Sequence, residues 1–121
     1  MGVLAWIVGL VLAVGMLGAG SSKLRGVPAM EESRVRFGLS AGLWRMIGAL
    51  EVLSAPGLII GLLTNDNNAE WIGFLAAVGI VALLIGAIVY HARAGDAPKE
   101  MMPAGVMLVL AVLYIVFIGA R

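Results

Sequence analysis

The sequence contains no cysteine and few charged residues, and both shortages limit what the protein can be. Without cysteine, the chain performs no disulfide or thiol chemistry and binds no metal through thiolates. Its single histidine leaves no metal-binding motif. Charged residues make up 12% of the 121 residues, hydrophobic residues make up 62%, and the mean hydropathy is +1.08. A soluble domain of this size has too little interior to bury so much apolar surface, so we expect a membrane protein.

Four segments are apolar enough to cross a bilayer, which takes roughly 17–25 residues. They cover residues 3–20, 43–63, 71–91 and 104–120, each to within a few positions. The first segment lacks the positively charged start of a cleaved signal peptide, and its apolar run is too long, so we interpret it as a retained helix. The expected fold is all-α: a single transmembrane domain over residues 1–121, built as a four-transmembrane-helix bundle.

Positive charge is distributed unevenly between the segments that connect these spans. Four spans place both termini on one side of the membrane, and the loops at 21–42 and 92–103 on the other. Seven of the eight Lys and Arg residues lie on the side of these two loops, and only Arg121 lies opposite. The positive-inside rule therefore predicts that the two loops are cytoplasmic and both termini are outside, in a multi-pass protein of the cell membrane.

The loop at 21–42 contains a further helix candidate, with the sequence PAMEESRVRFG. Pro28 suits the first turn of a helix, and Glu31 and Glu32 follow early, where acidic side chains favour a helix start. The pattern predicts a short helix at the membrane interface that begins at Pro28.

Lipid provides no hydrophobic driving force for helix association, so helices pack closely where small residues let their backbones approach. Small residues at helical spacing therefore predict where the helices contact each other. The stripe on the second span consists of Gly48, Glu51 and Ala55. The stripe on the third span consists of Gly79, Ala82, Gly86 and Tyr90. Gly57 and Gly61 form a GxxxG pair that permits a homo-oligomer but is equally suited to a contact within the chain. We interpret the stripes as packing surfaces of a tight bundle.

Glu51 is the charged residue that fits its surroundings least. It lies about 12 Å along the second span, where a charged carboxylate costs at least ~2–3 kcal/mol. It should therefore face the bundle, and either pair with a cation or be protonated. Lys23, Arg45 and His91 are the candidate partners, although Arg45 lies about 120° round the same helix and is poorly placed.

The candidate polar cluster within the membrane consists of Glu51, Lys23, Arg45, His91, Tyr90 and Tyr114. A structural ion pair would explain any one of these residues as well as a function would, because buried polar groups in membranes serve both purposes. The cluster taken together favours a functional site.

Three segments of the chain carry a family resemblance. They are GSSKL at 20–24, RMIGALEVLSAPGL at 45–58 and GAIVYHARAGD at 86–96. In order and spacing they resemble the DoxX-like family of small four-helix bacterial membrane proteins, over nearly the whole chain. The resemblance implies a four-helix bundle, and its polar positions would be Lys23, Arg45, Glu51 and His91.

The resemblance also implies a link to redox systems of the bacterial inner membrane. Some relatives are tied to thiosulfate:quinone oxidoreductase, with a second subunit or domain, and others to responses to oxidative or thiol stress. The favoured hypothesis is an accessory protein or subunit that binds a lipid-soluble molecule, of which a quinone is an example, and serves a partner protein.

Three other functions stay open at this point. One is a small proton-coupled transporter, although four-helix transporters of this length carry their acid in the first helix, which here has no charge. A second is a self-contained membrane enzyme with Glu51 as general acid or base. The third is a purely structural assembly factor. The sequence identifies no cofactor, and its net charge of +1 gives no indication of a nucleic-acid partner.

Overall fold

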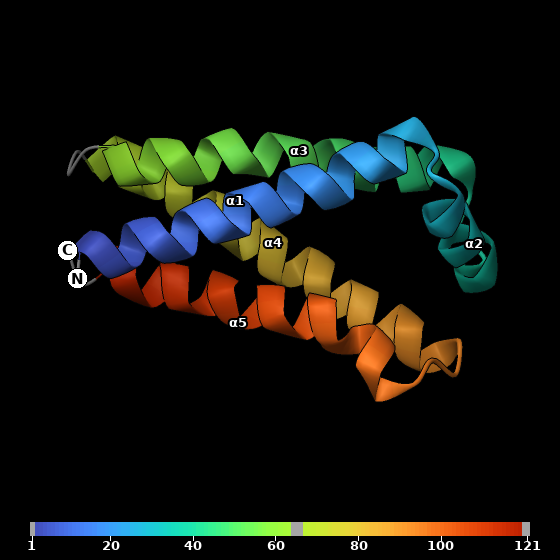
Figure 1. The fold of residues 1–121 in the computed structure, drawn as a ribbon. Helices are drawn as coiled ribbons and strands as arrows, with labels where there is room; N and C mark the ends of the chain where they lie inside the picture. The colour runs from blue at the N-terminus through green and yellow to red at the C-terminus, as the bar shows by residue number, and fades with distance from the viewer. Residues whose placement is uncertain (1, 64–66, 120–121) are drawn as a thin grey trace.

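The structure, a computed structural model, describes residues 2–63 and 67–119 and is made of helices throughout (Figure 1). The helices are α1 (Gly2–Arg25), α2 (Pro28–Phe37), α3 (Ala41–Leu63), α4 (Asn67–Arg93) and α5 (Pro98–Gly119). No strand occurs in these two described ranges, so the predicted all-α fold is confirmed.

The four long helices α1, α3, α4 and α5 are each long and apolar enough to cross a membrane, and the protein is a multi-pass membrane protein. Several extend beyond the apolar segments seen in the sequence. The helix α1 continues to Arg25, and α5 begins at Pro98. Hydropathy marks only the part of a helix inside the hydrocarbon, and the helices continue through the interface on either side.

The short helix that the sequence predicted from Pro28 is present as α2, and it lies at one end of the bundle (Figure 1). It begins at Pro28 and ends at Phe37, and none of its residues is buried. Gly38 ends it in the left-handed conformation, with φ 72°, which glycine adopts without steric cost. The start of α1 and the end of α5 lie together at the opposite end of the bundle (Figure 1).

Each long helix contacts two neighbours, so the order around the bundle is α1, α3, α4, α5. The pair α1–α3 and the pair α4–α5 diverge toward the end that carries α2 (Figure 1). The buried residues show the same asymmetry, because none of residues 85–110, all of which are described, is buried. The core is therefore concentrated in the half of the bundle away from α2.

Tyr114 of α5 occupies the centre of this core and is fully buried. Its hydroxyl donates a 2.7 Å hydrogen bond to the carbonyl oxygen of Leu58 on α3. Glycines on the three other long helices make room for it. A Cβ atom at Gly61 would lie 2.5 Å from the hydroxyl, one at Gly73 would also collide with it, and one at Gly9 would lie 3.2 Å from the ring. The ring thus joins all four long helices.

The GxxxG pair on α3 is used inside the chain. A Cβ atom at Gly61 would lie 2.7 Å from the Cα atom of Gly73 on α4. One at Gly57 would lie 3.0 Å from the Cβ atom of Ala76, also on α4. Of the two uses that the sequence left open, the contact within the chain is the one observed.

The prediction that Gly79, Ala82, Gly86 and Tyr90 form a packing stripe inside the bundle is wrong. Gly79 and Ala82 are exposed, and no other described element lies within 4 Å of a Cβ atom built at Gly79 or Gly86. The helix α4 instead buries the face that carries Ala77, Ile80 and Leu84. Both faces are apolar, and lipid accepts small and large apolar residues alike, so composition could not identify the inner one.

Candidate functional site

The structure separates the predicted polar cluster into several places. Lys23 and Glu51 form an ion pair between α1 and α3. Tyr90 and His91 lie near the end of α4, beside α2. Tyr114 lies in the core described above, away from both groups.

Glu51 is buried in the middle of α3. It follows the first residue of that helix by ten positions, or about 15 Å, in a helix that is about 34 Å long. The ammonium group of Lys23 lies 2.8 Å from its Oε1 atom, and the two side chains are 12% and 6% exposed respectively. The predicted stripe on this helix is confirmed, because Gly48, Glu51 and Ala55 are all buried.

The ion pair forms because α1 and α3 approach each other closely at two glycines. A Cβ atom at Gly20 would lie 2.5 Å from the carbonyl oxygen of Gly48, and one at Gly48 would lie 2.9 Å from the carbonyl oxygen of Gly20. Lys23 follows Gly20 by almost one turn, and Glu51 follows Gly48 by the same step. The two antiparallel helices thus bring the ammonium group and the carboxylate together.

The other two candidate partners do not reach Glu51. Arg45 is exposed, as its angular position on the helix indicated. His91 instead approaches Asp96, in the turn between α4 and α5. Lys23 is therefore the cation that compensates the charge of Glu51.

Trp44 lies beside this ion pair, one helical turn before Gly48. Its side chain is buried, with 5% of the residue exposed, and the ammonium nitrogen of Lys23 lies 5.1 Å from the centre of its ring. The indole N–H is buried and has no hydrogen-bond partner among the described residues. An indole N–H can only donate, and leaving it unpaired costs about 1–3 kcal/mol. The site thus contains a buried donor that no described residue satisfies.

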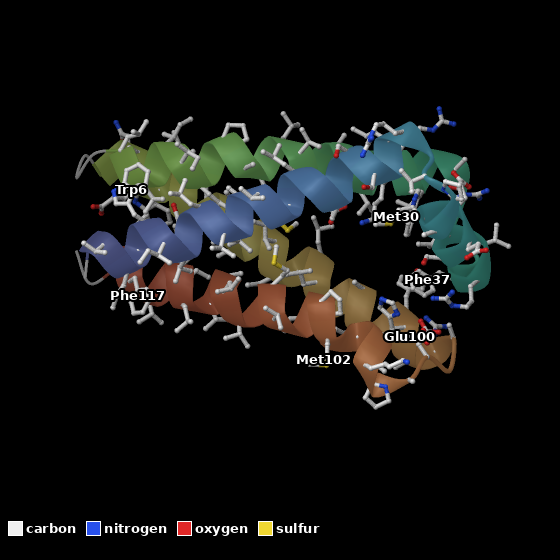
Figure 2. All side chains as sticks on the ribbon, in the orientation of Figure 1. Trp6, Met30, Phe37, Glu100, Met102 and Phe117 are labelled. Carbon is white, nitrogen blue, oxygen red and sulfur yellow. The ribbon has the colours of Figure 1, made fainter. Side chains whose placement is uncertain are left out.

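Phe37 is the last residue of α2 and is labelled in Figure 2. Its ring connects this site with the end of α4. Its ring lies 6.3 Å from the ring of Trp44 in an edge-on arrangement. On its other side, ring centres lie 5.9 Å away at Tyr90 and 4.9 Å away at His91. The helix α2 is thereby placed between α3 and α4 at the open end of the bundle.

Asp96 attaches α2 to the turn after α4. Its Oδ2 atom lies 2.5 Å from Nδ1 of His91 and accepts a 2.9 Å hydrogen bond from Arg36 of α2. A carboxylate only accepts hydrogen bonds, so Nδ1 of His91 is the donor. The hydrogen bond from His91 and the nearby guanidinium of Arg36 lower the pKa of Asp96 below its ordinary value of 3.8, although its burial opposes the shift.

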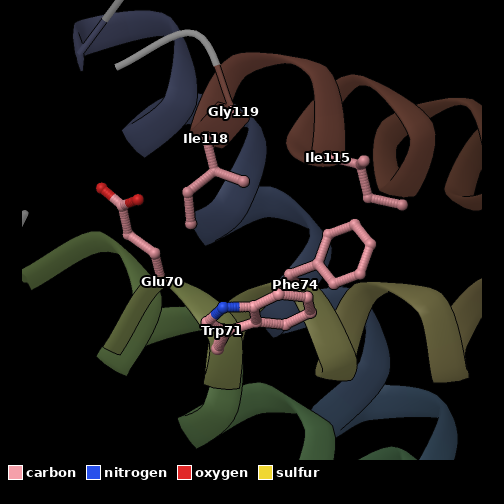
Figure 3. A pocket seen from close by; sticks show the side chains of 6 residues that line it. All are labelled: Glu70, Trp71, Phe74, Ile115, Ile118 and Gly119. Carbon is pink, nitrogen blue, oxygen red and sulfur yellow. The ribbon is translucent and has the colours of Figure 1, made fainter. Parts of the chain in front are cut away.

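Two of the surface cavities among the described residues lie at opposite ends of the bundle. The smaller one, of about 230 Å³, lies between α2 and α4. The larger one has a volume of about 400 Å³ and lies between α4 and α5, at the end away from α2. Figure 3 shows its lining residues, which are Glu70, Trp71, Phe74, Ile115, Ile118 and Gly119. It contains none of the predicted polar cluster.

Sequence reasoning missed the residues that connect the predicted ones. Asp96 follows Gly95, whose φ of 77° turns the chain, and its backbone N–H bonds to the carbonyl oxygen of His91. A Gly-Asp pair just after a helix is a turn signal that could have placed this carboxylate near His91. The contacts of Phe37 depend on how α2 lies across the bundle, and no local pattern indicates that.

Comparison with known protein families identifies the family of the chain. The family model of the DoxX-like family matches residues 7–114, which include every residue of the predicted polar cluster. The family resemblance seen in the sequence is therefore confirmed. No curated protein and no solved structure matches the chain.

Proposed function

The chain belongs to the DoxX-like family, and from this starting point we propose that it is a membrane accessory protein or subunit that binds a lipid-soluble molecule, a quinone being the chemical class that fits best, for a membrane redox system. The site would lie at Trp44, Lys23 and Glu51.

The observation that carries this proposal is the unpaired indole N–H of Trp44 beside the ion pair. Lipid acyl chains offer no acceptor to it, whereas each carbonyl oxygen of a quinone does. The ammonium group of Lys23 is a second donor at the same place. After reduction, a quinol hydroxyl would donate to the carboxylate of Glu51, so the three side chains suit both redox states of such a ring.

The shape of the bundle supports a ligand with an apolar tail. The two helix pairs diverge toward α2, and no residue from 85 to 110 is buried, although the structure describes all of them. An isoprenoid or acyl tail could lie along these uncovered faces while its head reaches Trp44.

Small residues on the outer face of α4, at Gly79, Ala82 and Gly86, support the role as an accessory protein. Gly79 and Ala82 are exposed, and Gly86 has open space where a Cβ atom would be. Small residues let the backbone of a second membrane helix approach closely. A helix of a partner subunit would therefore contact α4 on this face.

We further infer that the α2 end faces the cytoplasm. Lys23, Arg34, Arg36 and Arg93 lie at this end, and the positive-inside rule places such residues in the cytoplasm. The head of the ligand would then bind nearer to the cytoplasmic surface, where a soluble or peripheral redox partner could reach it.

Native mass spectrometry of protein extracted gently from its own membrane tests the proposal. Trp44→Phe keeps an aromatic ring but removes the N–H, which bonds to no described residue, so the fold should be unaffected. We expect the wild type to carry a small molecule that is lost in Trp44→Phe and in Glu51→Gln. Its mass would show whether it is a quinone.

The matched control is Trp71→Phe, which changes an exposed indole at the other end of the bundle and should retain the ligand. Wild-type protein without any bound molecule would contradict the proposal. Equal occupancy in wild type and Trp44→Phe would also contradict it, and Glu51 would then be a structural residue only.

A further inference from the structure

The cavity between α2 and α4 is separate from the site at Trp44 and has a different chemical character. Its volume is about 230 Å³, several times the share of about 30 Å³ that one water takes in the liquid. Its lining consists of Arg36, Phe37, Tyr90, Arg93 and Ala94. The cavity lies where α4 ends, at the end of the bundle that carries α2.

Positive charge dominates this cavity. The guanidinium of Arg36 is paired with Asp96, at 2.9 Å, but that carboxylate is shared with His91. Arg93 lies over the ring of Tyr90, with 5.9 Å from its Cζ atom to the ring centre, and within the described ranges it has no carboxylate partner. One guanidinium at the cavity is therefore without a compensating anion.

Hydrogen-bond donors are also available there. The hydroxyl of Tyr90 forms no hydrogen bond with any other residue that the structure describes. Guanidinium groups present their donors in a planar fork that matches the oxygens of a phosphate. Two arginines and a phenol around one cavity thus suit an oxyanion, and they disfavour a cation.

The neighbouring surface indicates where this oxyanion comes from. Below the cavity, toward the membrane centre, α4 exposes Ile85 and Val89, which are 50% and 46% exposed. They lie one to two helical turns before Arg93 and form an apolar approach to the cavity. A lipid whose phosphate occupied the cavity would lay its acyl chains along this face.

We propose that this cavity binds the phosphate group of an anionic membrane lipid, held by Arg93, Arg36 and Tyr90. The phosphate completes the charge balance of Arg93 at the end of α4. This proposal does not depend on the ligand of Trp44, because the two sites share no donor.

The test uses the full-length protein, delipidated in detergent, with dioleoyl phosphatidylglycerol as the probe and native mass spectrometry as the readout. Arg93→Gln removes the unpaired guanidinium, and we expect its affinity for the lipid to fall about tenfold, in line with the loss of a charge-assisted hydrogen bond. Arg93→Lys keeps the positive charge but not the planar fork of donors. We expect its affinity for the lipid to lie between those of the wild type and Arg93→Gln.

Arg45→Gln is the matched control, because Arg45 is an exposed arginine at the same end of the bundle but on α3, outside the cavity. We expect it to retain phosphatidylglycerol. If Arg45→Gln and Arg93→Gln lost affinity for the lipid equally, or if Arg93→Gln lost none, the proposed site would be wrong. If free glycerol phosphate bound as tightly as phosphatidylglycerol, the bound phosphate would not have to come from a lipid, and that part of the proposal would be wrong.

Discussion

The two ends of this bundle are built from different chemistry. At the end away from α2, one buried tyrosine contacts glycines on three other helices, and the core residues gather around it. At the α2 end, α1 and α3 stay together through Gly20 and Gly48, while α4 and α5 move away from them. A small membrane bundle can thus concentrate its close helix packing in one half and place its buried ion pair in the other.

The difference follows from where the small residues lie. Gly9, Gly61 and Gly73 are level with Tyr114, so that four backbones can approach a single ring. Near the α2 end, close contact between backbones involves α1 and α3 alone among the described glycines. Helices without such close contacts gain less of the van der Waals packing that holds helices together in lipid.

The largest expected effect comes from breaking the ion pair at the polar end. Lys23→Met leaves the carboxylate of Glu51 buried without a cation, and breaking a buried pair in this way typically costs about 3–5 kcal/mol. Reversible unfolding in mixed detergent micelles measures the free energy of unfolding. Lys23→Met combined with Glu51→Leu should recover most of the loss, since no buried charge remains. A single variant as stable as the wild type would contradict the importance of the pair.

A smaller effect is expected from crowding the packed end. Gly61→Ala places a methyl group against the hydroxyl of Tyr114 and the backbone of Gly73, and overpacking of this kind costs about 1–3 kcal/mol. Gly79→Ala is the matched control, because a Cβ atom there meets open space, and alanine favours a helix over glycine. Thermal unfolding in detergent should lower the Tm of the first variant only. Equal shifts of the Tm in Gly61→Ala and Gly79→Ala would contradict the distinction between glycines inside the bundle and glycines on its outer surface.

The smallest effect concerns how α2 is held by Asp96. Because the pKa of this carboxyl is lowered in the folded protein, its charged form stabilises the contact at pH values above its ordinary pKa of 3.8. That stabilisation is lost as the pH falls below 3.8 and through the lowered pKa, where the carboxylate takes up a proton. We therefore expect α2 to be held tightly at neutral pH and to loosen only under acidic conditions.

Spin labels on cysteines at Val35 and Ala97 would measure this, since the chain has no cysteine of its own. The distance distribution of the wild type should broaden only as the pH falls below 3.8 toward the lowered pKa of Asp96. In Asp96→Asn it should already be broad at pH 7. A distribution that stays narrow in Asp96→Asn would show that Arg36 and Asp96 do not hold α2.

Most of the fold could be predicted from the sequence, because its signals are local. Long apolar runs identify membrane spans whatever their partners are, and Pro28 marks the start of α2 by its own backbone geometry. The buried face of α3 could also be predicted, since Glu51 shares it and a charge must face away from lipid. On α4 no charge distinguishes the faces, and there the predicted stripe was wrong.

The site was only partly predictable, because its contacts join residues from different helices. The sequence proposed three cations for Glu51, and choosing Lys23 required knowing that Gly20 and Gly48 bring α1 against α3. Asp96 and Phe37 were not predicted, since their partners lie on elements whose relative placement no local pattern specifies. The unpaired state of the Trp44 indole is likewise a property of the assembled bundle.

The divergence of the two helix pairs has a consequence for how binding is measured. If the proposed ligand reaches Trp44 between the two helix pairs, it enters from the bilayer, and the concentration that governs its occupancy is its mole fraction among the lipids. Doubling the lipid at constant protein and ligand would dilute the ligand about twofold and weaken the apparent affinity to the same degree. Dissociation constants for the proposed ligand would therefore be comparable only at a stated lipid-to-protein ratio.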